Sequence, residues 1–113
     1  MAYDEALAER IRELVAGEPG VTEMKMFGGL AFLVRGNMAI AASGNGGVLV
    51  RVDPEEGDAL TTTTPAELME MRGRQMAGWL RVGAEHIATK RGLAPWVDRG
   101  VLYARSLPPK KKR

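Results

Sequence analysis

The chain has 113 residues, a length typical of one domain, and 45% of them are hydrophobic, which is enough for a core and excludes global disorder. It contains no cysteine, so disulfides, thiolate metal sites and thiol nucleophiles are excluded. The acidic start at residues 2–5 lacks the apolar core of a signal peptide, and no run reaches the ~18 apolar residues of a membrane span. We therefore expect a cytoplasmic location and no membrane partner.

The formal net charge of +2 hides a strong asymmetry along the chain. Residues 1–71 carry five basic and twelve acidic side chains, a balance of −7, whereas residues 72–113 carry eleven basic and two acidic ones, a balance of +9. A basic face attracts phosphate or acidic protein. The alternative is that the two halves neutralise each other within the fold or across a dimer, because the halves of a small α+β domain usually interleave in space.

The first predicted element is a helix with one apolar stripe at i, i+4, i+7 and i+8, formed by Leu7, Ile11, Leu14 and Val15. Gly17 and then Pro19-Gly20 end it. Four strands follow, at residues 23–26, 30–34, 38–42 and 48–52. In the first strand, methionines alternate with charged residues, so we predict that it is half-buried. Gly36 and Asn37 tolerate positive φ and form a hairpin connection between the second and third strands. Tight connections join the four strands into an antiparallel meander.

A short helix is predicted next, because Asp53 can cap it and Pro54 suits its first position. Gly57 limits it to a short piece, and residues 61–64 are a polar break. Residues 65–82 admit two interpretations. Thr64-Pro65-Ala66-Glu67 is compatible with the cap of another helix, but the strand preference of Trp79, Leu80 and Val82 favours a hairpin of residues 68–71 and 76–82.

The last third predicts two helices, one at residues 84–91 that ends at Gly92 and one with Pro95 in its first turn. Pro108-Pro109 stops the second. The whole order predicts a two-layer α+β domain made of an N-terminal helix, an antiparallel meander, a short helix, a β-hairpin and two C-terminal helices. We expect a single domain over residues 1–107 and a basic tail at residues 108–113.

Few residues suggest catalytic chemistry. His86 is the only histidine, no nucleophile elbow surrounds either serine, and the acidic residues 53–58 lack the spacing of a calcium loop and suit a helix N-terminus. The glycine clusters at 28–29 and 44–47 precede strands rather than helices, which favours bulges or turns over phosphate loops. We expect no metal site and no cofactor.

The methionines at positions 24, 26, 38, 69, 71 and 76 allow two interpretations. Filling of the core is the simpler one. An adaptable apolar pocket beside the sheet is the other.

Three motifs resemble those of one known family. Met26-Phe27-Gly28-Gly29, Gly78-Trp79-Leu80 before the late helices and Trp96-Val97 in the last helix follow the pattern of the TfoX/Sxy family N-terminal domain. The resemblance covers nearly the whole chain. It implies a small two-layer fold similar to secretion chaperones, in which Met26, Phe27, Gly28, Gly29 and Trp79 are structural.

The functional context also comes from this resemblance. Known members are similar in being regulators of bacterial competence genes that act as coactivators with the cyclic-AMP receptor protein, and the longer regulators have a second, helical domain. The family supplies no catalytic residues. We therefore expect a non-enzymatic regulatory or adaptor domain that acts through protein or weak nucleic-acid contacts. The alternative is a small-molecule-binding or enzymatic domain that uses a methionine-lined pocket.

The expected partners are a second copy of the chain, a transcription protein, and DNA bound weakly without sequence preference. The basic last third offers the contact residues for these partners, because phosphate and acidic surfaces attract Lys and Arg. The candidates are Arg72, Arg74, Arg99, Arg105, Lys110, Lys111, Lys112 and Arg113.

Overall fold

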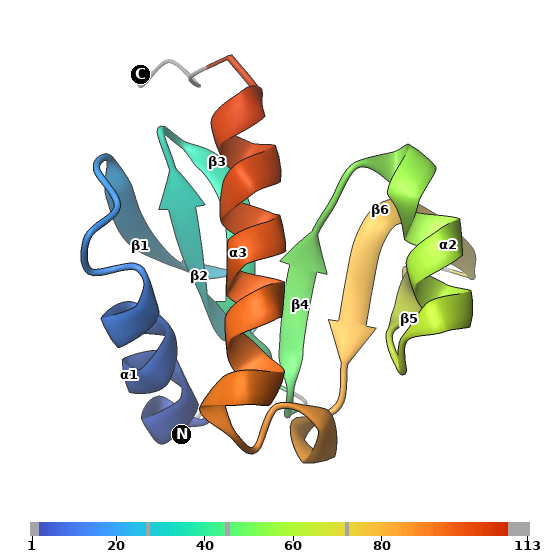
Figure 1. Ribbon diagram of the computed structural model, residues 1–113, viewed down its shortest axis with the longest axis horizontal. Coiled ribbons are helices and arrows are strands. Elements are labelled where there is room, and N and C mark those ends of the chain that lie inside the picture. The colour runs from blue at the N-terminus through green and yellow to red at the C-terminus, as the bar shows by residue number, and fades with distance from the viewer. Residues whose placement is uncertain (1–2, 27, 45, 72, 109–113) are drawn as a thin grey trace.

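The computed structural model describes residues 3–26, 28–44, 46–71 and 73–108, and within them a six-stranded antiparallel sheet carries three α-helices on one face (Figure 1). The strand order across the sheet is β1-β2-β3-β4-β6-β5. The strands are β1 Val21–Met26, β2 Gly29–Val34, β3 Asn37–Ala42, β4 Val48–Arg51, β5 Glu67–Met71 and β6 Arg74–Val82. The helices are α1 Glu5–Leu14, α2 Pro54–Thr63 and α3 Lys90–Ser106, with a 3₁₀ turn at Ala84–His86. The predicted α+β class, the meander and the late hairpin are confirmed.

Each helix begins at a side chain that accepts hydrogen bonds from its first turn. The carboxylate of Asp4 accepts from the amides of Ala6 and Leu7, and that of Asp53 accepts from the amide of Glu55. The hydroxyl of Thr89 accepts from the amide of Gly92. These caps satisfy amides that lack partners within a helix, and they fix where each helix starts.

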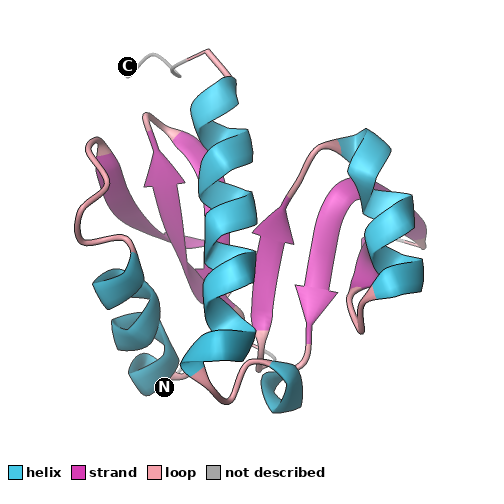
Figure 2. Ribbon diagram, in the orientation of Figure 1, coloured by secondary structure: helices cyan, strands magenta, loops and turns pink. Residues whose placement is uncertain are grey.

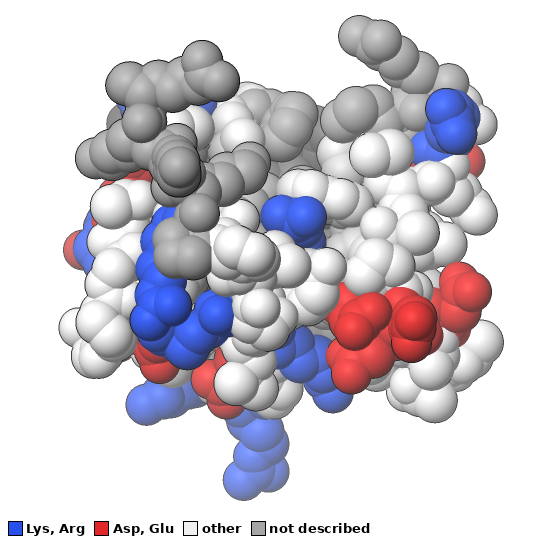
Figure 3. Space-filling view, turned by 90° about the horizontal axis from the view of Figure 1, so that it is seen from above, with Lys and Arg blue, Asp and Glu red and all other residues white. Residues whose placement is uncertain are grey.

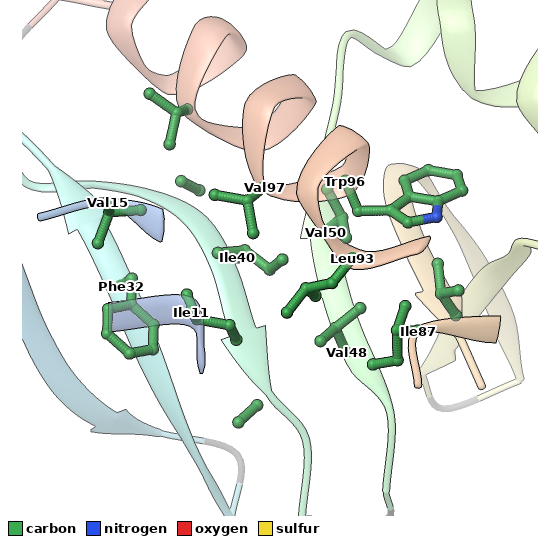
Figure 4. Close-up of a cluster of buried hydrophobic side chains, with 14 of the residues drawn as sticks. Ile11, Val15, Phe32, Ile40, Val48, Val50, Ile87, Leu93, Trp96 and Val97 are labelled. Atoms are coloured by element: carbon green, nitrogen blue, oxygen red, sulfur yellow. The ribbon is translucent and has the colours of Figure 1, made fainter. Parts of the chain in front are cut away.

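The main core lies between the sheet and the helix layer, where α3 crosses the middle of the sheet between α1 and α2 (Figure 2). Figure 4 shows Leu93 and Val97 of α3 directed toward β3 and β4, the ring of Trp96 extending to the β6 side, and Ile11 of α1 beside Phe32. Gly100 allows α3 to lie this close to the sheet, because a Cβ there would be 2.3 Å from the carbonyl oxygen of Ala39.

The opposite face of the sheet is concave and carries a second apolar cluster, formed by Ala31, Leu33, Met38, Ala41 and Leu49, with Met26, Met69 and Trp79 packed against it. Met26 lies at one edge of the sheet and Met69 at the other, yet both line one hollow. The sheet must therefore curl so that its two edges approach each other. Register shifts at Phe32/Leu33 and at Leu68/Met69 mark bulges, which bend strands. We call this side the concave face.

The predicted hairpin turn at Gly36 and Asn37 is shifted by one residue. The positive φ angles fall on Arg35, at 53°, and Gly36, at 85°. Asn37 is instead the buried first residue of β3, and its side-chain amide donates to the carbonyl oxygen of Pro108 at 2.9 Å. The long-range bond to the end of the chain explains why asparagine lies there.

The prediction for the last helices was wrong in its boundaries. Residues 84–91 do not form one helix; a single 3₁₀ turn is followed by α3, which starts at Lys90 and contains both Gly92 and Pro95. The cap at Thr89 accounts for the early start, because its hydroxyl satisfies the amide of Gly92 at 3.1 Å.

The prediction for α2 was too short. Gly57 does not limit the helix, which continues to Thr63. Gly57 is buried against β6, and this packing offsets the roughly 1 kcal/mol that glycine costs inside a helix. The hydroxyls of Thr61, Thr62 and Thr63 donate back to helix carbonyls, so the threonines belong to the helix.

The first strand is more exposed than predicted. Val21 and Met26 are half-buried, but the four residues between them are exposed. β1 is an edge strand that pairs with β2 alone, so its alternating pattern has less to pack against.

Candidate interaction surface

The concave face holds a hollow of about 120 Å³ lined by Met26, Leu49 and Met69, with Ser43 and Arg81 among its polar residues. Sites for small-molecule ligands usually measure ~300–1,000 Å³. This hollow has room for about one side chain. It therefore suits a contact with a protrusion on another macromolecule better than a site that encloses a metabolite.

The methionines split between the two interpretations made from sequence. Met38 is buried in the floor of the concave face, which is core filling. Met26 and Met69 stand half-buried at the two sides of the hollow, and Met76 pairs with Met69 across β5 and β6. Met24 is 52% exposed. The side chain of Met71 lies outside the described residues. The flexible thioethers of Met26 and Met69 thus line the hollow and can adapt to what enters it.

The side chain of one arginine contacts two aromatic rings where β4 ends. The guanidinium carbon of Arg51 lies 5.2 Å from the ring centre of Trp79 and 5.6 Å from that of Tyr103. Trp79 is opposite Arg51 in the register of β4 and β6, and Tyr103 comes from α3. Cation–π contacts of this kind contribute about 0.5–2 kcal/mol each. Three elements therefore fix the orientation of one guanidinium.

This arginine lies at an opening in the sheet. The pairing of β3 with β4 stops at Ile40 and Val50, so Arg51 has no neighbour on β3. All three stacked side chains are half-buried. Among the described residues, no carboxylate lies within 4.0 Å of Arg51 and no acceptor binds its guanidinium. We call Arg51, Trp79 and Tyr103 the arginine clamp.

The basic residues predicted as contacts are not gathered in one patch. Arg74 is exposed at the start of β6, and Arg99 lies on α3 with its guanidinium 4.7 Å from the ring of Trp96. Arg105, also on α3, is ion-paired with Glu18. Arg72, Lys110, Lys111, Lys112 and Arg113 lie outside the described residues. The role of the whole set as a contact surface stays a prediction.

The motif residues meet the concave face. Met26 lines the hollow and Trp79 belongs to the clamp. Gly28 has a φ of 74°, in the left-handed region. A Cβ on Gly29 would lie 2.1 Å from the carbonyl oxygen of Ala42 on β3. Phe27 lies outside the described residues. The motif thus serves the close approach of β2 to β3 and one side of the hollow.

Residues 13–104 match the family model described as the TfoX N-terminal domain. The chain belongs to the TfoX N-terminal domain family. The match runs from the end of α1 nearly to the end of α3 and includes the concave face and the arginine clamp. No curated protein matches the chain in sequence.

The acidic and basic halves of this TfoX N-terminal domain are only partly neutralised by ion pairs. Within the described residues, Arg105 with Glu18 is the ion pair that joins the two halves of the chain. Figure 3 shows acidic side chains gathered on the side of α2, whose first turn contains Glu55 and Glu56. At this end of the molecule the acidic residues therefore stay gathered, which agrees with the first of the two interpretations of the charge asymmetry.

A bidentate ion pair joins α1 to β1. The guanidinium of Arg12 donates to both carboxylate oxygens of Glu23, at 2.6 and 2.9 Å, and also to Glu9. These bonds lower the pKa of Glu23 and raise the pKa of Arg12. Both partners are substantially exposed, so the contact positions the edge strand and makes a small, pH-dependent contribution to stability.

The remaining candidate catalytic side chains, His86 and Ser106, make only local contacts. His86 is exposed, with its Nε2 3.7 Å from the carboxylate of Glu85. The hydroxyl of Ser106 donates to the carbonyl oxygen of Tyr103. In the described part of the chain, no group of three or more His, Asp or Glu is arranged to hold a metal ion, and no helix is long and apolar enough to cross a membrane.

Sequence reasoning missed two members of the arginine clamp. Arg51 follows an apolar strand and Tyr103 sits four residues before the predicted end of a helix, positions that carry no local signal. Their contact depends on how α3 crosses β4, which is a tertiary property. Trp79 was singled out, but as a structural residue.

Proposed function

We propose that this TfoX N-terminal domain is a non-enzymatic regulatory adaptor that acts by holding a protein partner on its concave face. The observation that carries the proposal is the half-buried ring of Met26, Met69 and Trp79 around a buried apolar floor. Methionine and aromatic residues are enriched in the cores of protein interfaces. A flexible methionine rim also tolerates partners of different shape.

Two further observations support this choice over a small-molecule domain. The hollow of about 120 Å³ fits one side chain of a partner. The family match supports a regulatory context, in which resemblance to competence regulators makes a transcription protein the expected kind of partner. The location in the cytoplasm belongs to the same proposal.

The test is capture of proteins from native lysate by the full chain, with and without nuclease. Met69→Glu places a charge at the hollow, and Leu102→Glu is the matched control because Leu102 is 69% exposed on α3, away from the concave face. We expect the wild-type chain and Leu102→Glu to capture the same proteins after nuclease, and Met69→Glu to lose them while keeping its circular dichroism spectrum. Equal capture by folded Met69→Glu, or capture that nuclease abolishes, contradicts the proposal.

The proposal also predicts no intrinsic turnover. A screen of hydrolase and transferase substrates is expected to show nothing above background, because the sequence offers no nucleophile–base pair. His86→Ala is the control for trace activity. Turnover that disappears in His86→Ala, or in a chain with Asp53 and Asp58 changed to Asn, contradicts the proposal that the domain is not an enzyme.

A further inference from the structure

We propose that the arginine clamp is a binding site for a single carboxylate group. Arg51 supplies the charge and the hydrogen-bond donors, and Trp79 and Tyr103 hold its guanidinium in place. The inference goes beyond the adaptor function and does not depend on it, because it concerns an anion site that small probes can test directly.

The hydrogen-bond donors of the Arg51 guanidinium are not used by any other described residue. The guanidinium carbon lies 5.2 and 5.6 Å from the two ring centres, and a guanidinium carries five N–H donors in a fixed planar fork. None of the described residues accepts a hydrogen bond from the guanidinium of Arg51 or forms an ion pair with it. A hydrogen bond from a guanidinium to a carboxylate is charge-assisted and about twice as strong as a neutral one. The planar fork of arginine matches the two oxygens of a carboxylate.

The other arginines with recorded contacts differ from Arg51. Arg12 and Arg105 already bind glutamates, and Arg10 donates to the carbonyl oxygen of Ile87. Arg99 contacts the ring of Trp96 alone, so one aromatic ring holds its guanidinium rather than two. Of the arginines that the structure describes, Arg51 is the one stacked on two rings.

The surrounding charge favours a carboxylate over the phosphate backbone of nucleic acid. Asp53 lies two residues after Arg51, and its own carboxylate is used to cap α2 at 2.9 Å from the amide of Glu55. Glu55, Glu56 and Asp58 add exposed negative charge to the same helix. A polyanion would meet this acidic helix, whereas one carboxylate needs only the clamp.

The experiment is a titration of the ¹⁵N-labelled full chain, followed through the Arg51 Nε–H and Trp79 indole N–H signals. The probes are the blocked peptide acetyl-Gly-Glu-Gly-amide, its Gln counterpart and inorganic phosphate. We expect saturable shifts of both signals with the Glu peptide and none with the Gln peptide. Arg51→Lys keeps the charge but loses the fork, and we expect it to weaken binding about tenfold, the effect of one charge-assisted hydrogen bond.

Arg51→Gln and Arg99→Gln complete the test, with the second as the matched control for a stacked arginine outside the clamp. We expect Arg99→Gln to bind the Glu peptide as the wild type does and Arg51→Gln to show no saturation at Trp79. If Arg51→Gln fails to fold, the comparison of Arg51→Lys with Arg99→Gln decides. Saturation by phosphate without the Glu peptide, or equal responses in Arg51→Lys and wild type, overturns the carboxylate assignment.

Discussion

Gly29 shows how one residue decides the geometry of the sheet. It begins β2 at a point where a Cβ would lie 2.1 Å from the carbonyl oxygen of Ala42, a distance that side chains do not adopt. β3 would have to move to admit any other residue. Because β2 and β3 supply the floor of the concave face, this one glycine links the family motif to the shape of the candidate surface.

We expect Gly29→Ala to lower the free energy of unfolding by about 1–3 kcal/mol, as overpacking of a tight contact does. Urea denaturation measures the change. Gly17→Ala is the control, since no heavy atom lies within 4 Å of a Cβ at that position, and it is expected to stay within about 0.5 kcal/mol of the wild type. Equal stability of the two variants would contradict this prediction, because it would mean that the backbone at Ala42 moves aside for the added methyl group without a cost in free energy.

Single residues also show where sequence reasoning stops. The motif singled out Gly29 and Trp79 as structural residues, and both have close contacts in the fold. The clamp was not, because Arg51 and Tyr103 are 52 positions apart and meet only through the crossing of α3 over β4. Local patterns do not encode such contacts.

At the scale of elements, α1 and β1 are joined by the bidentate contact of Arg12 with Glu23. The contact lowers the pKa of Glu23 from its ordinary value of 4.5. A carboxylate whose pKa is lower in the folded state stabilises the fold above the unfolded value, and this contribution is lost as the pH falls through the folded pKa.

We therefore expect Glu23→Gln to reduce stability at neutral pH and to flatten the loss of stability below pH 4.5. Thermal unfolding across the acid range measures both effects. Glu13→Gln, an exposed residue of α1, is the control and is expected to follow the wild-type profile. A Glu23→Gln profile parallel to that of the wild type at every pH would contradict the role assigned to the contact.

Most elements were predictable because each has a strong local pattern. The apolar stripe of α1 and the runs of the meander follow from hydrophobic patterning, and the hairpin of β5 with β6 was favoured by the strand preference of its residues. The failures occur where a tertiary contact outweighs a local signal: Gly57 rests against β6 and Thr89 caps α3 ahead of Gly92. Asn37 likewise starts β3 because it reaches Pro108.

At the scale of the whole molecule, the separation of charge and the exposed edge strand favour self-association. β1 pairs with β2 alone in the described structure, and acidic side chains stay gathered on the side of α2 (Figure 3). A two-fold axis would bring the acidic side of one copy against basic residues of the other.

We expect a homodimer at high micromolar concentration and low salt. Light scattering should give twice the 12.2 kDa mass of the chain. Raising the salt concentration tests how much charge attraction contributes to dimer formation, since screening weakens contacts between exposed charges. A monomer mass at low salt refutes the dimer.

The basic last third predicts weak, sequence-independent binding to duplex DNA. Titration of labelled duplex at two salt concentrations should give a log–log slope near −0.9 for each phosphate contact. A chain ending at Leu107 is the comparison that removes the tail. Absence of binding by the intact chain at ~50 mM salt rules out the DNA contact, and equal binding by both chains moves it from the tail to the folded domain.

The central claim, a protein partner on the concave face, is tested most directly by methyl NMR of the full chain in nuclease-treated native lysate. The account predicts that the methyl signals of Met26 and Met69 broaden or shift, while those of Leu102, exposed on α3, stay sharp. Met69→Glu should leave the Met26 signal unchanged by lysate. Signals of Met26 and Met69 that do not respond, or a response confined to Leu102, would contradict the account.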